Sequence, residues 1–275
     1  MPQTQIRGWF FANDCRRSFL SETLLPTLVC FVVCFALSGV AYSADNPQPT
    51  AAAVTSDPAI VIGFVGGHVH HDDFRHAEVQ LAKKLGAEYG SRAHVGIFEN
   101  RRQEDARLSV LKWLDADSHG KVPDYQKRRA RIILYGHSWG ASAVVELARE
   151  LQKDRIPVLL TIQVDSITKF GEDDHIIPAN VALAVNFYQT GGVFHGNREI
   201  VAADPGHTSI LGDFRFEYKK QPESCSTYPW FARHFMKGHT SIECDPRVWS
   251  RIEALIGEYL LPPQTQAAEA ITRNF

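Results

Sequence analysis

The stretch from residue 131 to residue 151, RIILYGHSWGASAVVELAREL, constrains the fold more than any other part of this chain. An apolar run at 132–135 leads into Gly-His-Ser-Trp-Gly at 136–140, and apolar residues then recur at helical spacing. This pattern predicts a buried strand, a sharp turn and a helix. The two glycines let strand and helix pass each other closely, and the turn holds Ser138 in strained backbone at its tip.

Ser138 is the candidate nucleophile, because a Gly-x-Ser-x-Gly turn between a strand and a helix presents its hydroxyl at the edge of a sheet. The helix that follows offers the backbone N–H of Trp139 to a developing oxyanion, and the helix dipole aids it. The alternative is a serine that caps an ordinary helix. That alternative gives the two glycines no purpose, so the pattern favours the nucleophile.

The composition is that of one globular domain, with 275 residues, 44% of them hydrophobic and 22% charged. We expect the domain to span residues 58–263 and a flexible tail to follow at 264–275. The net charge is −2, and the sequence has no basic run of the kind that binds nucleic acid. Neither nucleic acid nor an acidic membrane surface is therefore indicated as a partner.

The N-terminal residues 1–44 have the layout of an export signal. Arg7, Arg16 and Arg17 precede an uncharged stretch at 24–44, which small residues close. Because this stretch is also long enough to span a bilayer, an uncleaved anchor is the alternative, although cleavage is favoured. Either outcome places the domain, after a linker at 45–57, outside the cytoplasm, periplasmic or secreted. A membrane is expected as a partner only through an uncleaved segment.

Cys225 and Cys244 are the only cysteines after the N-terminal segment. An even pair in an oxidising compartment is expected to bond, so we predict a disulfide between them. Two free, buried cysteines are the alternative.

Apolar segments alternate with segments of helical period along the rest of the domain. Besides the strand before Ser138, strands are predicted at 60–65, 93–98, 157–164 and 181–188, with weaker patterns at 199–203 and 209–218. Helices are predicted at 77–89, 106–114 and 246–261, the last of which begins with Asp245 as cap and Pro246 in its first turn. This alternation predicts a mostly parallel, doubly wound sheet with helices on both faces.

The chain resembles the α/β-hydrolase superfamily, and within it compact bacterial serine hydrolases of esterase, lipase or thioesterase type. The resemblance covers residues 60–261 and rests on GFVGG at 63–67, GHSWG at 136–140, VDSI at 164–167 and GHTSIECDP at 238–246. It implies the α/β-hydrolase fold and catalytic residues in the chain order serine, acid, histidine.

His239 is the candidate base, because it lies between the last predicted strand and the last predicted helix, where the superfamily places its histidine. His207, which stands in a similar sequence context, is the runner-up, ahead of His195 and His234.

Asp165 is the candidate acid, because it ends a hydrophobic strand, and the carboxyl ends of such strands border the ligand crevice. The superfamily more often places the acid after the next strand, so Asp204 and Asp213 stay open as alternatives. A bland role for Asp165, capping the following turn, also stays open.

The resemblance implies a second oxyanion donor in the loop after the first strand, where Gly67 and His68 follow Gly66. An aromatic-rich stretch at 211–236 is expected to fold over Ser138 and, through Trp230 and Phe231, to form an apolar acyl pocket with Trp139. Ordinary core aromatics are the alternative.

No cofactor or metal is expected. The run HVHHDD at 68–73, with His76 beyond it, resembles the ligand run of metallo-β-lactamase-like hydrolases. That fold does not use a nucleophile elbow, so a metal-dependent hydrolase is the least favoured alternative.

These patterns together predict an exported serine hydrolase that cleaves a carboxylic ester or thioester of a small molecule or lipid. The predicted triad is Ser138, His239 and Asp165, acting through an acyl-serine intermediate. The alternative from another class is a catalytically silent binding protein with the same fold.

Overall fold

The computed structural model describes residues 58–218, 225–226 and 228–261. The predicted export signal or anchor, the linker and the C-terminal tail lie outside these ranges. Within them, no helix is both long enough and apolar enough to cross a membrane.

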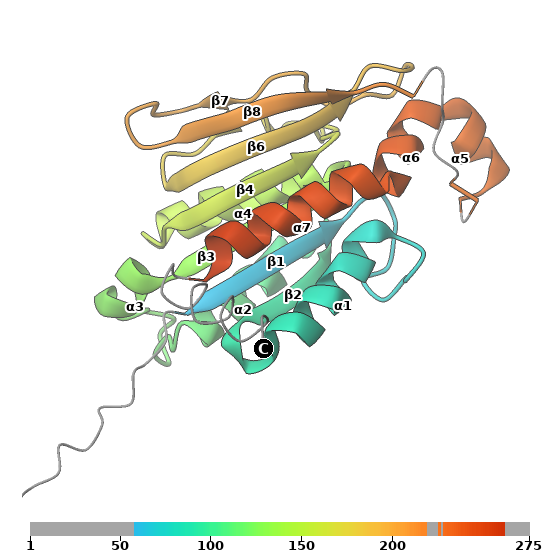
Figure 1. Cartoon of the computed structure of the whole chain (residues 1–275). Coiled ribbons are helices and arrows are strands. Elements are labelled where there is room, and N and C mark those ends of the chain that lie inside the picture. Colours follow the sequence, from blue (N-terminus) through green and yellow to red (C-terminus); the bar gives the residue numbers. More distant parts are fainter. Residues whose placement is uncertain (1–57, 219–224, 227, 262–275) are drawn as a thin grey trace, which may run out of the picture. The chain divides into compact units, whose positions relative to one another are not determined.

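The main sheet has its strands in the order β2-β1-β3-β4-β6-β8, and every pairing is parallel (Figure 1). Its strands are β1 (Ala59–Val65), β2 (His94–Glu99), β3 (Arg131–His137), β4 (Val158–Val164), β6 (Val181–Gln189) and β8 (Ser209–Phe216). Two short strands, β5 (Ile176–Ile177) and β7 (Val201–Ala202), pair separately. The predicted parallel sheet is confirmed.

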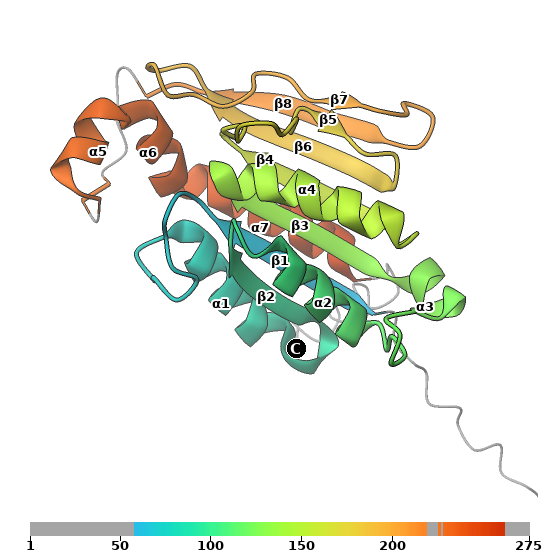
Figure 2. The same cartoon turned by 180° about the vertical axis from the view of Figure 1, so that it is seen from behind.

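Helices cover both faces of this sheet. They are α1 (Ala77–Tyr89), α2 (Gln103–Trp113), α3 (Asp124–Arg129), α4 (Trp139–Lys153), α5 (Trp230–Phe235), α6 (Lys237–Cys244) and α7 (Pro246–Leu260), with a short 3₁₀ turn at Gly90–Arg92. Figure 1 shows α1 and α7 on one face, and Figure 2 shows α2 and α4 on the other. Helices α5 and α6 lie beyond the end of the sheet toward which the strand arrows point.

The core is divided into two layers because successive residues of a strand point to opposite faces. Ile62 of β1 and Leu134 of β3 belong to the layer under α2 and α4, whereas their neighbours Val61 and Ile133 belong to the layer under α1 and α7. All four side chains are fully buried. Burial on both faces explains why these strands read as continuous apolar runs in the sequence.

The main strands and long helices match the sequence prediction, but the short elements do not. The pattern at 199–203 yields only β7, and α3, α5 and α6 were not predicted. Helices of six to eight residues carry too few apolar positions to define a period, so tertiary contacts decide them.

Cys225 and Cys244 form a disulfide, with their Cα atoms 5.6 Å apart. Cys225 precedes α5 and Cys244 ends α6. The bond therefore closes a loop that contains both helices.

Gly140 of the serine turn is expected to tolerate no side chain. A Cβ atom at this position would lie 2.3 Å from the carbonyl oxygen of Phe64 in β1, so α4 would have to move off the sheet. We expect Gly140→Ala to lower the free energy of unfolding by about 3 kcal/mol in urea denaturation. The matched control is Gly86→Ala on α1, where a Cβ meets nothing within 4 Å. It should raise stability by about 0.5–1 kcal/mol, and equal effects of the two changes would contradict the packing argument.

Candidate active site

The site lies where the strand order reverses. From β1 the chain passes outward to β2 and then returns to β3 on the other side of β1. In open parallel sheets, ligands bind outside the carboxyl ends of the strands at such a point. Here the loop after β1 meets the turn after β3, since a Cβ added to Gly66 would lie 3.0 Å from the Cβ of Ser138.

Ser138 has the strained backbone that the turn pattern predicts, with φ 59° and ψ −127°. Its side chain makes no capping hydrogen bond with α4. The hydroxyl instead lies 2.9 Å from Nε2 of His239. The structure therefore excludes the interpretation of Ser138 as an ordinary helix cap.

The sequence suggested that His239 lies in a loop between two elements, but the structure places it on α6. It is 3% exposed, and its Nδ1 lies 2.7 Å from Oδ2 of Asp165. Gly238 makes this placement possible, because a Cβ there would lie 2.2 Å from the side-chain oxygen of Gln189 at the end of β6. A glycine in a helix is locally unfavourable, but here it lets α6 approach the sheet.

Asp165 follows β4 and is fully buried, with φ 44°. Besides contacting His239, its carboxylate accepts hydrogen bonds from the backbone N–H of Gly196 at 2.7 Å and from the side-chain amide of Gln189 at 2.8 Å. These partners lie far along the chain, so Asp165 does not act as a cap for the following turn.

Gln189 and Gly196 were not identified from the sequence. Gln189 ends β6, the strand after which the superfamily more often carries its acid, and it supplies an amide there instead of a carboxylate. Gly196 approaches so closely that an added Cβ would lie 2.3 Å from the carbonyl carbon of Asp165. An isolated glycine in an irregular loop gives no signal of such an approach.

The alternative acids and the alternative base lie elsewhere. Asp204 pairs with His207 at 2.7 Å, and His207 is exposed. Asp213 on β8 accepts hydrogen bonds from the side chain of Asn186 and from the backbone of Ile200. Of the alternatives considered, only Asp165 is hydrogen-bonded to His239.

The electrostatics keep the carboxylate charged and the imidazole neutral. Burial raises the pKa of Asp165, but hydrogen bonds from His239, Gln189 and Gly196 outweigh it, and the pKa is lowered. Burial lowers the pKa of His239, the positive charge of nearby His137 lowers it further, and Asp165 opposes both. With Nδ1–H donating to Asp165, Nε2 of His239 is free to accept the proton of Ser138.

A cavity of about 110 Å³ adjoins Ser138 and His239. Part of its lining comes from the loop after β1 and from the segment around α5, and part from polar side chains behind the serine turn. The further lining residues are Gly66, Gly67, Val69, His76, His137, Tyr228, Ala232, Met236, Thr240 and Glu243. Trp230 and Phe231, predicted from the sequence as pocket residues, are 64% and 54% exposed and do not line this cavity. Ala232 lies on α5, and Met236 directly follows the helix. Because the two residues are four positions apart, both face the cavity, and Trp230 and Phe231 face outward.

The predicted oxyanion donors stand around the same turn. Trp139 begins α4 directly after Ser138, and Gly67, at φ 47°, lines the cavity. His68 does not line it, and its ring instead meets the Trp139 ring edge-on, with the ring centres 5.7 Å apart. Only its backbone remains a candidate donor.

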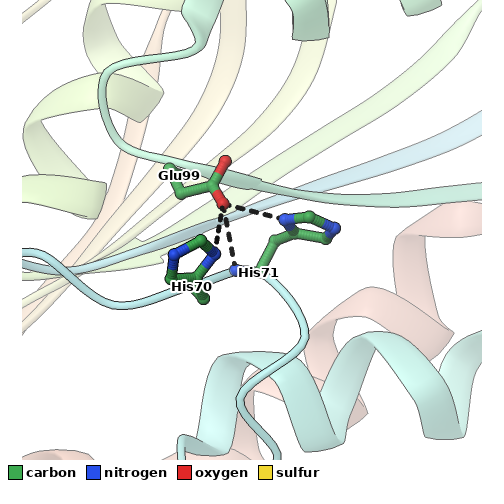
Figure 3. A group of neighbouring side chains, drawn as sticks. All are labelled: His70, His71 and Glu99. Atoms are coloured by element: carbon green, nitrogen blue, oxygen red, sulfur yellow. Dashed lines mark hydrogen bonds and ion pairs between the residues drawn. The ribbon is translucent and has the colours of Figure 1, made fainter.

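The histidine-rich loop does not gather its side chains around one point. His68 packs on Trp139, whereas His70 and His71 both turn toward Glu99 at the end of β2 (Figure 3). Asp73 is hydrogen-bonded to Arg75. The ligand run suggested by the resemblance to metallo-β-lactamase-like hydrolases is therefore spread over separate partners.

No protein-family model and no curated protein sequence matches this chain. Among solved structures, it is similar to a YdeN-like hydrolase from Pectobacterium atrosepticum (13% identity, 75% of this chain and 94% of that chain, TM-score 0.37). It is also similar to the RedJ thioesterase of prodiginine biosynthesis in Streptomyces coelicolor (14% identity, 79% and 99%, TM-score 0.37) and to an acetyl xylan esterase (10% identity, 74% and 99%, TM-score 0.35).

At these identities and scores the likeness says nothing about the substrate of this chain. Its fold follows from its own coordinates: a parallel sheet with helices on both faces, and a strained serine turn at the carboxyl end of β3. The order along the chain of Ser138, Asp165 and His239, which lie in contact, agrees with that turn. The chain therefore has the fold of the α/β-hydrolase superfamily.

Proposed function

We propose that this protein is a serine hydrolase that cleaves a carboxylic ester or thioester through an acyl intermediate on Ser138. The observation that carries the proposal is the unbroken series of hydrogen bonds from Asp165 through His239 to a serine hydroxyl that makes no capping bond. A hydroxyl is a poor nucleophile at neutral pH unless a positioned base removes its proton, and this series supplies the base.

In the acylation step, the Ser138 oxygen attacks the carbonyl carbon of the substrate while Nε2 of His239 takes the hydroxyl proton. Asp165 holds the Nδ1–H of His239 and stabilises the imidazolium that forms. When the tetrahedral intermediate collapses, His239 returns the proton to the departing alcohol or thiol. Water then repeats the sequence on the acyl-serine, and the acid leaves with Ser138 restored.

The oxyanion is assigned to the backbone N–H of Trp139 and to that of Gly67 or His68. Trp139 begins α4, so its N–H has no partner within the helix and carries the positive end of the helix dipole. Donors fixed in this way cost no reorganisation when the charge develops.

The cavity favours a small acyl group. Its volume of about 110 Å³ is well below the roughly 300–1,000 Å³ of typical small-molecule sites. We therefore choose p-nitrophenyl acetate as the assay substrate.

The export pattern of the N-terminal residues and the disulfide of Cys225 with Cys244 support action outside the cytoplasm, since disulfides persist in oxidising compartments.

A fluorophosphonate probe tests the proposal, because it reacts with serine only where the hydroxyl is activated. We expect the wild type to be labelled and Ser138→Ala to be unlabelled. Ser142→Ala is the matched control, since Ser142 is a buried serine one turn along α4 that donates to Glu172 and does not line the cavity. It should keep its labelling. A wild type that folds but neither reacts with the probe nor hydrolyses p-nitrophenyl acetate would instead indicate the silent binding protein.

A further inference from the structure

We propose that His76, Glu78, His137 and Glu243 form a binding site for a zinc ion directly behind the candidate active site. The four side chains come from three elements: His76 and Glu78 from the start of α1, His137 from the end of β3, and Glu243 from α6. None of them has a part in the proposed reaction.

The first argument is the burial of four titratable side chains, one of which makes no hydrogen bond. His76 is 8% exposed, Glu78 0%, His137 4% and Glu243 2%. Among the described residues, neither carboxylate oxygen of Glu78 has a hydrogen-bond partner. The nearest cationic group to Glu78 is His137, whose Nδ1 lies 3.6 Å from Oε1 and is charged only when protonated. A buried carboxylate is costly unless it is paired, hydrogen-bonded or bound to a metal, and a metal ion would satisfy the oxygens of Glu78 that make no hydrogen bond.

The second argument is geometry. Ligand atoms at about 2.0–2.1 Å from a tetrahedral zinc lie about 3.3 Å from one another. Nδ1 of His137 lies 3.2 Å from Oε2 of Glu243 and 3.6 Å from Oε1 of Glu78. Nδ1 of His76 lies 2.7 Å from Oε1 of Glu243, and the ligand atoms of His76, Glu78 and Glu243 all fall within 4.8 Å of one another. These ligand atoms therefore lie close together, and small rotations of the side chains would be needed to bring all four to tetrahedral spacing.

The third argument is chemistry. Imidazole nitrogens and carboxylate oxygens are ordinary ligands of zinc, and four protein ligands make a closed, structural site. Two ionised carboxylates carry a charge of −2, which one divalent ion neutralises. Zinc would replace the proton on Nδ1 of His137, so the positive charge beside His239 would then come from the ion. The cavity beside Ser138 is lined by His76, His137 and Glu243, so an ion has a route to the site.

The consequence would be a fixed position for the base. Glu243 and His239 are four residues apart on α6 and share one face of the helix. His137 is the residue before Ser138, and its ring centre lies 4.5 Å from that of His239. A zinc ion that joins Glu243 to His137 would therefore tie the helix of His239 to the turn of Ser138. His239, Ser138 and Asp165 are not ligands, so the ion positions the base without taking part in the reaction.

A second group of ligating side chains serves as a matched control. His70, His71 and Glu99 converge on one carboxylate oxygen (Figure 3), but the two histidine side chains are 73% and 52% exposed. That oxygen already accepts hydrogen bonds from the ring and backbone nitrogens of His71. Unlike Glu78, Glu99 therefore has hydrogen-bond partners without a metal ion.

The test measures zinc on the full chain. The protein is treated with iodoacetamide to block free thiols, stripped with dipicolinate, and titrated with Zn²⁺ against a chromophoric chelator. Bound metal is then counted by mass spectrometry. The variants are Glu78→Gln, which keeps the shape of a side chain that makes no hydrogen bond, and the double variant His70→Gln/His71→Gln.

We expect one zinc per chain in the wild type and in the double variant, and an affinity at least about 100-fold weaker in Glu78→Gln. At zinc concentrations about 1,000 times Kd, Tm should rise by about 10 °C in the wild type and in the double variant. Tm of Glu78→Gln should not respond, although its metal-free Tm should stay within a few degrees of that of the wild type.

Three results would overturn the proposal: no zinc on the wild type at micromolar Zn²⁺, unchanged affinity in Glu78→Gln, or loss of zinc only in the double variant. The last would locate the metal at the exposed group. Zinc binding does not require an activated Ser138. Because zinc is not a ligand of Ser138, labelling of Ser138 by the fluorophosphonate does not require bound zinc. The two proposals can therefore fail separately.

Discussion

His239→Ala is expected to lower kcat for p-nitrophenyl acetate by about 10⁵-fold, which corresponds to about 7 kcal/mol of transition-state stabilisation. The reason is that, in the part of the chain that the structure describes, His239 is the histidine hydrogen-bonded to the serine hydroxyl. Nε2 of His239 lies 2.9 Å from Oγ of Ser138, and the alternative histidine, His207, is exposed and pairs with Asp204. Steady-state kinetics with circular dichroism and Tm as folding checks measure the effect.

His207→Ala is the matched control for this prediction. It removes an exposed imidazole that is also hydrogen-bonded to an aspartate, and kcat should stay within about twofold of the wild type. A loss smaller than tenfold in His239→Ala, in a variant that still folds, would contradict the assignment of the base.

The pH dependence of the wild type reports on the same residue. Only neutral imidazole can take the proton of Ser138, so activity falls as the pH drops through the pKa of His239. Burial and the positive charge of His137 lower that pKa from its usual 6.5, and Asp165 offsets part of the change. The acid limb of kcat/KM should therefore lie below pH 6.5, and a limb above pH 7 would contradict this environment.

Asp165→Asn is expected to lower kcat by about 10⁴-fold. The carboxylate accepts the Nδ1–H of His239 at 2.7 Å, which leaves Nε2 free of a proton. An asparagine amide in this position can donate to Nδ1 and so favour the tautomer with the proton on Nε2, where it faces Ser138. The loss should appear in kcat across the neutral range, and labelling of Ser138 by the fluorophosphonate should slow in parallel.

Asp204→Asn is the control for Asp165→Asn. It makes the same chemical change in an exposed aspartate that is also paired with a histidine, and it should leave kcat within about twofold of the wild type. If Asp204→Asn or Asp213→Asn lost activity while Asp165→Asn kept it, the acid would have been assigned to the wrong strand end.

The sequence was most informative where one local pattern fixed both backbone and packing. Gly136 and Gly140 around Ser138 could be interpreted because the strand before and the helix after them are long and periodic. His239 and Asp165 were predicted from their places relative to predicted elements, and the structure brings both to Ser138. That prediction needed the order of elements in a parallel sheet and the chain order of catalytic residues that the resemblance to the α/β-hydrolase superfamily implies.

The sequence did not show which way the aromatic side chains of α5 face, because aromatic content does not say how a short helix is oriented. Trp230 and Phe231 stand in an aromatic-rich segment, yet in α5 they point to solvent while Ala232 lines the cavity. Six residues carry too little pattern to define an inward face. The facing was decided by packing against other parts of the chain.

The sequence by itself predicted the parallel sheet and the strained turn at Ser138, because these depend on local periodicity, and it offered His239 and Asp165 as first candidates among several for the partners of Ser138. Only the tertiary structure decided that His239 lies on a helix and that Gln189 and Gly196 are hydrogen-bonded to Asp165. It also decided that four side chains meet behind the site: His76, Glu78, His137 and Glu243. These contacts join residues up to 167 positions apart, as between His76 and Glu243. Which residues meet in these contacts depends on distances in the folded chain, and the spacing of residues along the sequence does not report those distances.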